Sequence, residues 1–334
     1  MVNMPDSILE VRNLTVAFRT DEGEAIAVQD VSFHLYFKET LALVGESGCG
    51  KTVTALSLLR LINAPNAKIL SGEILFEGKN LLECSEKEMR EIRGNKISIV
   101  FQEPMTSLNP VFSVGNQALE ALLAHRSIPK SEAKKKVIEM FQRVGIPDAA
   151  SRYHAYPYEL SGGMRQRALI AMALVCEPKV LIADEPTTAL DVTIQSQILR
   201  LISQLQRETG MSVLIITHDL GVIAQVADRI AIMYASKIVE HGKDRDIFFH
   251  PLHPYTQGLL RSIAPDVQHA ERLPSIPGVV PIPTRFPDGC HFSPRCEHAT
   301  SRCHAEEPSG EDATGEHSVA CWEWRNLLQQ KAIA

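Results

Sequence analysis

The feature that most constrains this chain is a glycine-rich segment at positions 45–52, with the sequence GESGCGKT. An apolar run at 41–44 predicts a strand before it, and a helix is predicted after it over 52–61. Glycines permit a tight turn whose backbone N–H groups face phosphate oxygens, and the N-terminus of the following helix favours the same negative charge. The segment therefore predicts a nucleotide-phosphate site in an α/β protein.

Two side chains of this segment have specific roles in such a site. Lys51 is expected to reach the β- and γ-phosphates, and the Thr52 hydroxyl is expected to coordinate Mg²⁺. Cys49 has two interpretations: a redox-sensitive thiol activated by the helix dipole, or a small residue that fills a tight loop, which we prefer. The residues predicted here to bind nucleotide are Gly45, Ser47, Gly48, Cys49, Gly50, Lys51, Thr52 and Thr54.

The remaining sequence has the alternating pattern of an α/β protein. Between 110 and 160 the strand pattern stops, and apolar residues at 137, 138, 141 and 144 share one face of a predicted helix. The lysine run at 134–136 is expected to form the solvated side of that helix. The predicted strands span 8–19, 26–36, 40–44, 68–76, 96–101, 179–183, 212–217, 230–234 and 237–240.

Length and composition exclude several classes of protein. The 334 residues suggest roughly two domains, and 45% hydrophobic residues exclude a disordered chain. The net charge of −6 argues against bulk electrostatic attraction to nucleic acid or an anionic membrane. The longest uninterrupted apolar stretch, 168–176, has about half of the ~18 residues that span a bilayer. Positions 1–10 lack a secretory signal, so we expect a cytoplasmic protein that reaches a membrane through partners.

Two further motifs carry phosphate chemistry. The buried strand predicted at 179–183 is followed by Asp184, placed to bind Mg²⁺, and by Glu185, placed to orient or deprotonate a water. Upstream, LSGGMRQR at 160–167 puts Ser161, Gly162 and Gly163 at the start of a helix, a second phosphate cradle without its own lysine. Two half-sites in one chain predict that each meets its complement on another subunit.

In this order, the motifs resemble those of ATP-binding subunits of ABC transporters, for which LSGGMRQR is nearly diagnostic. The resemblance covers about 6–264 and implies a P-loop nucleotide-binding domain with a mixed sheet and a helical subdomain inserted at about 103–165. It implies that Gln102 senses Mg²⁺ and contacts membrane subunits, and that Asp191, in TALD, communicates across the dimer. It also implies that His218 contacts the γ-phosphate and that Phe18 stacks on adenine. The implied catalytic residues are Glu185, His218 and Lys51.

Composition changes near residue 265, which predicts a separate C-terminal extension over 265–334. The last 70 residues hold eight of the 19 prolines and four of the seven cysteines. The segments 253–260 and 276–281 resemble the peptide-importer branch of the family. That branch carries cysteine elements, which appear here as Cys290, Cys296 and Cys303, followed by Cys321.

The cysteines leave three alternatives open. Their spacing, C-x5-C-x6-C-x17-C, lacks the paired C-x2-C typical of structural zinc sites. Four thiolates from a proline-rich region can ligate an iron–sulfur cluster, and the resemblance implies a [4Fe–4S] cluster. Zinc and free structural thiols are the other two possibilities. Disulfides are disfavoured in a reducing cytoplasm.

The predicted function is that of an ATP-hydrolysing subunit, with ATP and Mg²⁺, that energises import of di- or oligopeptides. The implied partners are two transmembrane permeases, a second ATPase that is a paralogue, and an extracytoplasmic peptide-binding protein, at the cytoplasmic face of the inner membrane. No nucleic acid is expected. The alternatives are an importer or exporter of another cargo (nickel chelate, opine or drug), or a soluble ABC ATPase of DNA repair or translation. The short stretch between Gln102 and Ser161 leaves no room for the coiled-coil arms of the repair proteins.

Overall fold

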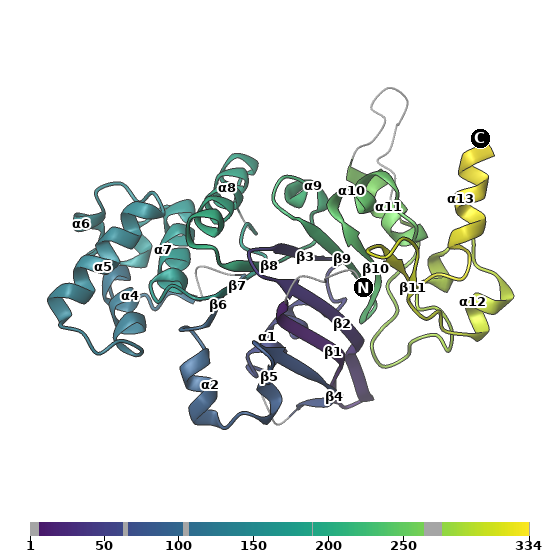
Figure 1. The fold of residues 1–334 in the computed structure, drawn as a ribbon, viewed down its shortest axis with the longest axis horizontal. Coiled ribbons are helices and arrows are strands. Elements are labelled where there is room, and N and C mark those ends of the chain that lie inside the picture. The colour runs from purple at the N-terminus through teal and green to yellow at the C-terminus, as the bar shows by residue number, and fades with distance from the viewer. Residues whose placement is uncertain (1–6, 63–65, 103–106, 189, 264–275, 334) are drawn as a thin grey trace. The chain divides into compact units, whose positions relative to one another are not determined.

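The computed structural model describes residues 7–62, 66–102, 107–188, 190–263 and 276–333 (Figure 1). The chain forms two compact units. Unit 1 contains residues up to 8, 35–40 and 83–216, and unit 2 contains 9–34, 41–82 and 217 onward. We describe each unit by itself.

Unit 1 is built on the parallel strands β6 (Ile97–Val100), β7 (Val180–Asp184) and β8 (Ser212–Thr217), with β7 between the other two. All residues of β7 and β8 are buried, as expected for parallel strands covered on both faces. Both strands coincide with or overlap the predicted apolar runs. The buried strand β7 ends at Asp184, so this carboxylate lies at the carboxyl edge of the sheet.

Helices account for most of the rest of unit 1. Figure 1 shows α4 to α7 gathered in one cluster, where α4, α5 and α7 pack against one another. In α5 the apolar face is buried and the lysine side is exposed, with Lys135 and Lys136 paired to Glu139 and Glu132, which confirms the prediction for 137–144. Of the predicted helical subdomain (103–165), residues 103–106 lie outside the described residues. The helices of unit 1 are α2 (Glu86–Ile92), α4 (Val114–Leu123), α5 (Lys130–Arg143), α6 (Ala149–Arg152), α7 (Gly162–Leu174) and α8 (Val192–Thr209).

Unit 2 contains two sheets. The antiparallel sheet has the order β2-β1-β4-β5, formed by most of β1 (Ser7–Thr20) and β2 (Gly23–Tyr36) together with β4 (Ala67–Phe76) and β5 (Lys79–Asn80). In the second sheet β3 (Thr40–Val44) runs parallel to β9 (Arg229–Tyr234), whereas β10 (Lys237–Lys243) runs antiparallel to β9. The second sheet is therefore mixed, as predicted. The helices described in unit 2 are α1 (Lys51–Leu58), α9 (Leu220–Ile223), α10 (Asp244–Phe249), α11 (Pro254–Ile263), α12 (Ser301–Ala305) and α13 (Trp324–Ile333).

The C-terminal extension is part of unit 2. Its short strands β11 (Glu311–Asp312) and β12 (Ser318–Val319) continue the mixed sheet beyond β10, and Val319 packs with Leu252 and Trp324. The predicted boundary at 264–265 lies outside the described residues. By its contacts, the described part of the extension belongs with the phosphate-binding loop.

A buried carboxylate fixes this attachment. Glu240 of β10 is 1% exposed and accepts hydrogen bonds from the backbone N–H groups of Leu252 and His253, at 2.7 and 3.0 Å. Its Oε1 also lies 2.8 Å from Nε2 of His317, which belongs to the extension. A buried carboxylate is tolerated only when it is hydrogen-bonded, so Glu240 ties the extension to the core sheet.

Among the described residues, no helix combines the length and the hydrophobicity that crossing a bilayer requires.

Candidate functional site

The phosphate-binding loop connects the buried strand β3 to helix α1 in unit 2. A Cβ at Gly45 would overlap the carbonyl oxygen of Met233, and a Cβ at Gly50 would overlap that of Ala27. Gly48 and Gly50 have φ of 80° and 104°, which disfavour any residue with a side chain. The glycines are therefore needed for the turn itself, and Ser47 and Gly48 at its tip are exposed.

Lys51 lies beneath this loop. Its side chain is buried, and Nζ donates to the carbonyl oxygens of Gly45 and Glu46 at 2.7 and 3.0 Å. A cation held there is placed to move to an anion bound in the turn. Thr52, in the first turn of α1, is partly exposed. The buried Thr54 hydroxyl donates to the Gly50 carbonyl at 3.0 Å, so it stabilises the junction of loop and helix, and its predicted contact with nucleotide stays a prediction.

The Cys49 thiol is fully buried inside the loop. Burial raises its pKa, although the nearby Lys51 ammonium opposes the shift. A buried, protonated thiol is a poor redox sensor, so the interpretation as a small loop-filling residue is the one that the structure supports.

The carboxylates predicted for catalysis lie in unit 1. Asp184 is 1% exposed at the end of β7. Glu185 adopts a left-handed backbone conformation with φ of 45°, and its N–H donates to the Ile216 carbonyl at 2.8 Å. Such a conformation in a non-glycine residue is costly and fixes the direction of the side chain.

Glu185 is held by two side chains. Its Oε2 accepts from Gln102 Nε2 and from Thr188 Oγ1, each at 2.8 Å. The structure therefore brings Gln102 and Glu185 together, 83 positions apart in sequence. The contact of Thr188 was not predicted, although its position three residues after Glu185, in a turn, is a usable signal.

The signature segment opens α7 in the same unit. Ser161 is the N-cap residue, and its Oγ accepts from the N–H of Met164 at 3.4 Å. Ser161 and Gly162 are exposed, and a Cβ at Gly163 would lie 3.1 Å from Ile194 Cγ2. This short turn presents its backbone to solvent at a helix N-terminus, where an anion is favoured.

The remaining predicted nucleotide residues lie at element ends or on the first sheet. Asp191 is the exposed N-cap of α8, and its neighbour at 189 lies outside the described residues. His218 is exposed directly after β8, and Phe18 is partly exposed on β1, opposite Ala67. Unit 2 thus carries the phosphate-binding loop, Phe18 and His218, and unit 1 carries Gln102, Ser161, Gly162, Gly163, Asp184, Glu185 and Asp191.

The predicted Mg²⁺ ligands offer suitable atoms. Thr52 supplies a hydroxyl, Gln102 a carboxamide oxygen and Asp184 a carboxylate, and hard divalent cations prefer such oxygen donors. Gln102 and Asp184 belong to unit 1, and Thr52 belongs to unit 2. The residues present therefore fit the ion in donor chemistry.

The four cysteines of the extension lie around one small cavity. Their cavity is also lined by His253 and Phe292, and the Cys290 N–H donates to the Cys303 carbonyl at 2.8 Å. All four are free thiols. Burial raises the pKa of Cys290 to about 11 and that of Cys321 to about 12, so a thiolate there needs a positive partner.

The cysteines do not form a site for a single ion. Within the described ranges, no group of three or more His, Cys, Asp or Glu side chains is arranged to hold a metal ion. The arrangement of these side chains therefore gives no support to the zinc alternative. A [4Fe–4S] cluster requires a different arrangement, because each thiolate binds a different iron and the four sulfurs do not converge on one ion.

Comparison with known proteins shows the family of the chain. Residues 28–188 match the ABC transporter family, and residues 239–303 match the C-terminal region of oligopeptide/dipeptide transporters. The chain is 52% identical over 318 residues to the dipeptide transport ATP-binding protein DppD of Bacillus subtilis (strain 168), covering 95% of each chain. It is 50% identical over 319 residues to a probable peptide ABC transporter ATP-binding protein of Sinorhizobium fredii, again covering 95% of each.

Solved structures show the same fold. The dimeric ABC transporter cassette MJ0796 matches with a TM-score of 0.64 and 26% identity, over 71% of this chain and 99% of that chain. The protein cbiO1 from Clostridium perfringens, part of the ABC transporter complex cbiONQ, matches with a TM-score of 0.63 and 30% identity, over 73% of this chain and 92% of that chain.

Proposed function

The chain belongs to the ATP-binding subunits of ABC transporters, and from this premise we propose that it hydrolyses ATP to energise import of di- or oligopeptides. The observation that carries the choice of cargo is the match of residues 239–303 to the C-terminal region of oligopeptide/dipeptide transporters. The competing cargoes are a nickel chelate, an opine and a drug. The competing roles are those of a soluble ABC ATPase in DNA repair or translation.

In the proposed reaction the backbone N–H groups of the loop donate to the ATP phosphates, and Lys51 exchanges its two carbonyl contacts for phosphate oxygens. Thr52, Asp184 and Gln102 would hold Mg²⁺, which would neutralise phosphate charge when bound. Glu185, fixed by Gln102 and Thr188, orients the attacking water and takes its proton. His218 contacts the γ-phosphate, and Phe18 stacks on adenine.

Each complete site takes the phosphate-binding loop of one subunit and Ser161 of another. The exposure of Ser161 and Gly162 supports this, because these two residues of the signature turn are accessible to another subunit. Asp191 communicates between the two sites. The second ATPase is a paralogue of this chain.

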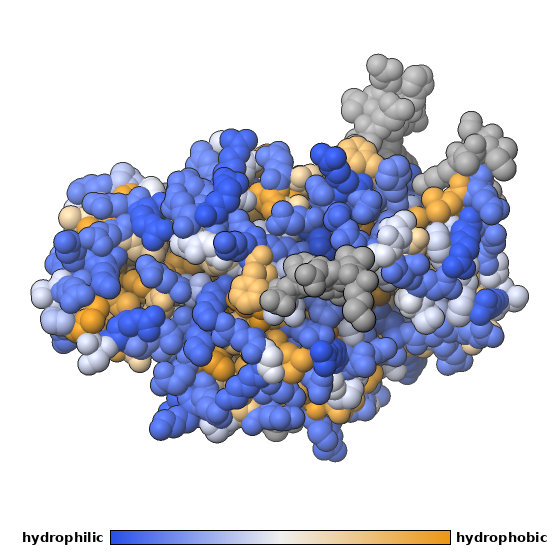
Figure 2. Space-filling model, viewed as in Figure 1, coloured by the Kyte–Doolittle hydropathy of each residue, from blue (hydrophilic) through white to orange (hydrophobic). Residues whose placement is uncertain are grey.

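The chain works as a peripheral subunit on the cytoplasmic face of the inner membrane, with two permeases and an extracytoplasmic peptide-binding protein. Unit 1 offers apolar contacts for a permease: Val111 and Phe112 are 69% and 53% exposed, and the rings of Tyr156 and Tyr158 stack at 5.5 Å on the surface. Figure 2 shows hydrophobic residues scattered among hydrophilic ones on the face shown. Apolar docking suits a chain whose net charge of −6 provides no attraction to anionic lipid.

Reconstitution tests the cargo. The subunit is assembled in vesicles with its permeases, second ATPase and binding protein, and ATP hydrolysis and uptake of a labelled dipeptide are measured. Dipeptide is expected to stimulate hydrolysis and to accumulate only with ATP. Stimulation by a nickel chelate, an opine or a drug, with no response to peptides, would replace the proposed cargo.

We also propose that Cys290, Cys296, Cys303 and Cys321 hold a [4Fe–4S] cluster. Support comes from their arrangement around one cavity and from the absence of disulfides among them. The cluster would supply positive charge for the four thiolates and cross-link loops that have few apolar contacts. On this proposal its role is structural and outside the hydrolysis reaction, or redox-sensing.

Iron analysis of anaerobically purified protein tests the cluster. We expect about four irons per chain and broad absorbance near ~400 nm. Cys290→Ser should lose the iron, whereas Cys176→Ser, at a buried cysteine of unit 1, should keep it. Protein that holds no iron under these conditions would leave four free structural thiols.

A further inference from the structure

The phosphate-binding loop is connected to the C-terminal extension through Glu46. This residue occupies the second position of the loop, between Gly45 and Ser47. Its backbone N–H donates to the hydroxyl of Tyr255 in α11 at 3.0 Å, and its carbonyl accepts from Lys51. Its carboxylate meets Arg295, 249 positions away in sequence. All these residues belong to unit 2.

The ion pair between Glu46 and Arg295 is bidentate, and its arginine is shielded from water. Arg295 Nη1 lies 2.7 Å from Glu46 Oε2, and Nη2 lies 3.2 Å from Oε1. The Arg295 side chain is 4% exposed and that of Glu46 is 31% exposed. Paired donors on a planar guanidinium fix both the position and the orientation of a carboxylate.

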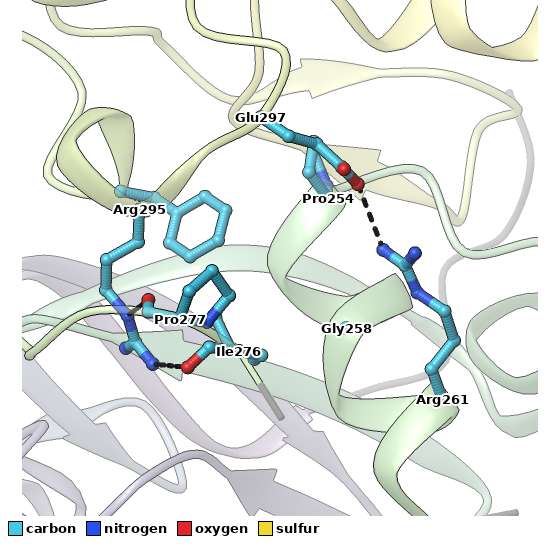
Figure 3. A pocket seen from close by; sticks show the side chains of 8 residues that line it. Pro254, Gly258, Arg261, Ile276, Pro277, Arg295 and Glu297 are labelled. Carbon is cyan, nitrogen blue, oxygen red and sulfur yellow. Dashed lines mark hydrogen bonds and ion pairs between the residues drawn. The ribbon is translucent and has the colours of Figure 1, made fainter. Parts of the chain in front are cut away.

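The other N–H groups of Arg295 are bonded to the extension and the core. Nε donates to the Pro277 carbonyl at 2.9 Å, and Nη2 donates to the Ile276 carbonyl at 3.2 Å, as drawn in Figure 3. Nη1 also donates to the Tyr234 hydroxyl at 3.4 Å. These five contacts match the five N–H groups of a guanidinium, so its orientation is fully determined.

We propose that Arg295 is a positioning residue for ATP binding, which acts from the extension by fixing the carboxylate of Glu46 and with it the phosphate-binding loop. Glu46 is the residue whose carbonyl accepts from Lys51, so a shift of Glu46 moves the lysine as well. The loop must hold its N–H groups in place before ATP arrives, and a preorganised loop loses less free energy on binding. The proposal depends on ATP binding alone and not on the nature of the cargo.

A double-mutant cycle tests this assignment. Arg295→Gln is expected to raise the Kd for MgATP of the full chain about tenfold, the effect of losing one charge-assisted hydrogen bond. In the assembled transporter the KM for ATP rises by a similar factor, while kcat at saturating ATP changes by less than about twofold. Arg295→Lys retains the positive charge but not the paired donors of the guanidinium, so its Kd for MgATP should lie between those of the wild type and Arg295→Gln.

Making Arg295→Gln in the Glu46→Gln variant distinguishes two roles of Arg295: positioning Glu46, and holding the extension together. Glu46→Gln should itself raise the Kd about tenfold, and adding Arg295→Gln should then change it by less than about twofold. If Arg295 only held Ile276 and Pro277, its substitution would weaken ATP binding equally in both backgrounds, which would overturn the proposal. A Kd for MgATP in Glu46→Gln equal to that of the wild type would also overturn the proposal. Glu46→Gln leaves the contacts of Arg295 with the Ile276 and Pro277 carbonyls intact, so it tests the proposal even if Arg295→Gln fails to fold.

The chain offers a matched control. Arg261, Glu297 and Arg295 line one pocket (Figure 3). Arg261 pairs with Glu297 at 3.3 Å, and both of these side chains are mostly exposed. Arg261→Gln removes an arginine and an ion pair close to Arg295 without touching the loop. It should leave the Kd for MgATP unchanged, and a tenfold change there would show that any loss of an arginine in this region weakens ATP binding.

Discussion

The two phosphate cradles of the chain are built in opposite ways. In the loop at 45–52, Gly45, Cys49 and Gly50 are buried, and Glu46 is bonded to Lys51 within the loop and to two distant residues, Tyr255 and Arg295. In the turn at 161–164, Ser161 and Gly162 are exposed, and the Ser161 hydroxyl accepts from the nearby N–H of Met164, a local N-cap contact. The first cradle is held in place by distant residues of its own chain, whereas the second presents exposed residues at the surface.

The largest expected effect concerns the residue proposed to activate water for ATP hydrolysis, which belongs to neither cradle. Glu185→Gln should lower ATP turnover by about 10²–10⁴-fold, because it removes the carboxylate that accepts the proton of water. Its amide keeps the shape, and MgATP binding, which depends on the loop at 45–52, should persist. ATP turnover and MgATP binding are both measured in the assembled transporter.

The control for this variant is Glu177→Gln, at an exposed glutamate just before the same strand, β7. It should retain full turnover. Hydrolysis at a near-normal rate in Glu185→Gln would remove Glu185 from the catalytic role.

A smaller effect tests whether the exposed turn serves the partner. Ser161→Arg adds a bulky cation at the N-terminus of α7 and should abolish hydrolysis at one of the two sites, the one with the partner's loop. In a mixed dimer, the site built on this chain's own Lys51 should keep its activity. Ser151→Arg, at an exposed serine of α6, serves as the control.

Site-specific activity is measured by combining each variant with Glu185→Gln or the equivalent change in the second ATPase. Loss confined to the site that contains the Lys51 of the Ser161→Arg chain would contradict the sharing of sites between subunits.

The smallest effect concerns the buried support of the first cradle. His253 is 1% exposed, and its Nδ1 accepts from the N–H of Tyr255, whose hydroxyl bonds Glu46. Burial lowers the pKa of His253 to about 4. The unfolded chain, with an ordinary pKa near 6.5, then binds the proton more readily. This contribution to stability is complete above about pH 6.5 and is lost as pH falls toward 4.

Denaturant unfolding at pH 7 and pH 5 measures this loss, which amounts to about 2 kcal/mol for such a shift. His253→Asn keeps an acceptor for the Tyr255 N–H but does not titrate, so the difference between the two pH values should shrink by that amount. His241, whose pKa burial also lowers to about 4, titrates in both proteins. His250→Asn, at an exposed histidine, should leave the difference unchanged, and an unchanged difference in His253→Asn would contradict the assignment.

Local sequence patterns predicted much of the fold. The strands at 40–44 and 212–217 were predicted with their observed bounds, because a buried parallel strand is an unbroken apolar run. The start of α5 at Lys130 was missed, since the predicted face began at 137 and the first turn is polar. Strands β11 and β12 have two residues each, which is too short for any periodicity to register.

The sequence by itself determined the loop at 45–52, the signature turn, the pair of carboxylates after β7 and the set of four cysteines, because each is encoded in a short run of residue types. Only the tertiary structure decided that Gln102 and Thr188 hold Glu185, that the cysteines share one cavity, and that Arg295 binds Glu46. The reason is physical. A hydrogen bond or ion pair requires atoms within about 3 Å, and residues as far apart in sequence as Glu46 and Arg295 reach that distance only through the path of the folded chain.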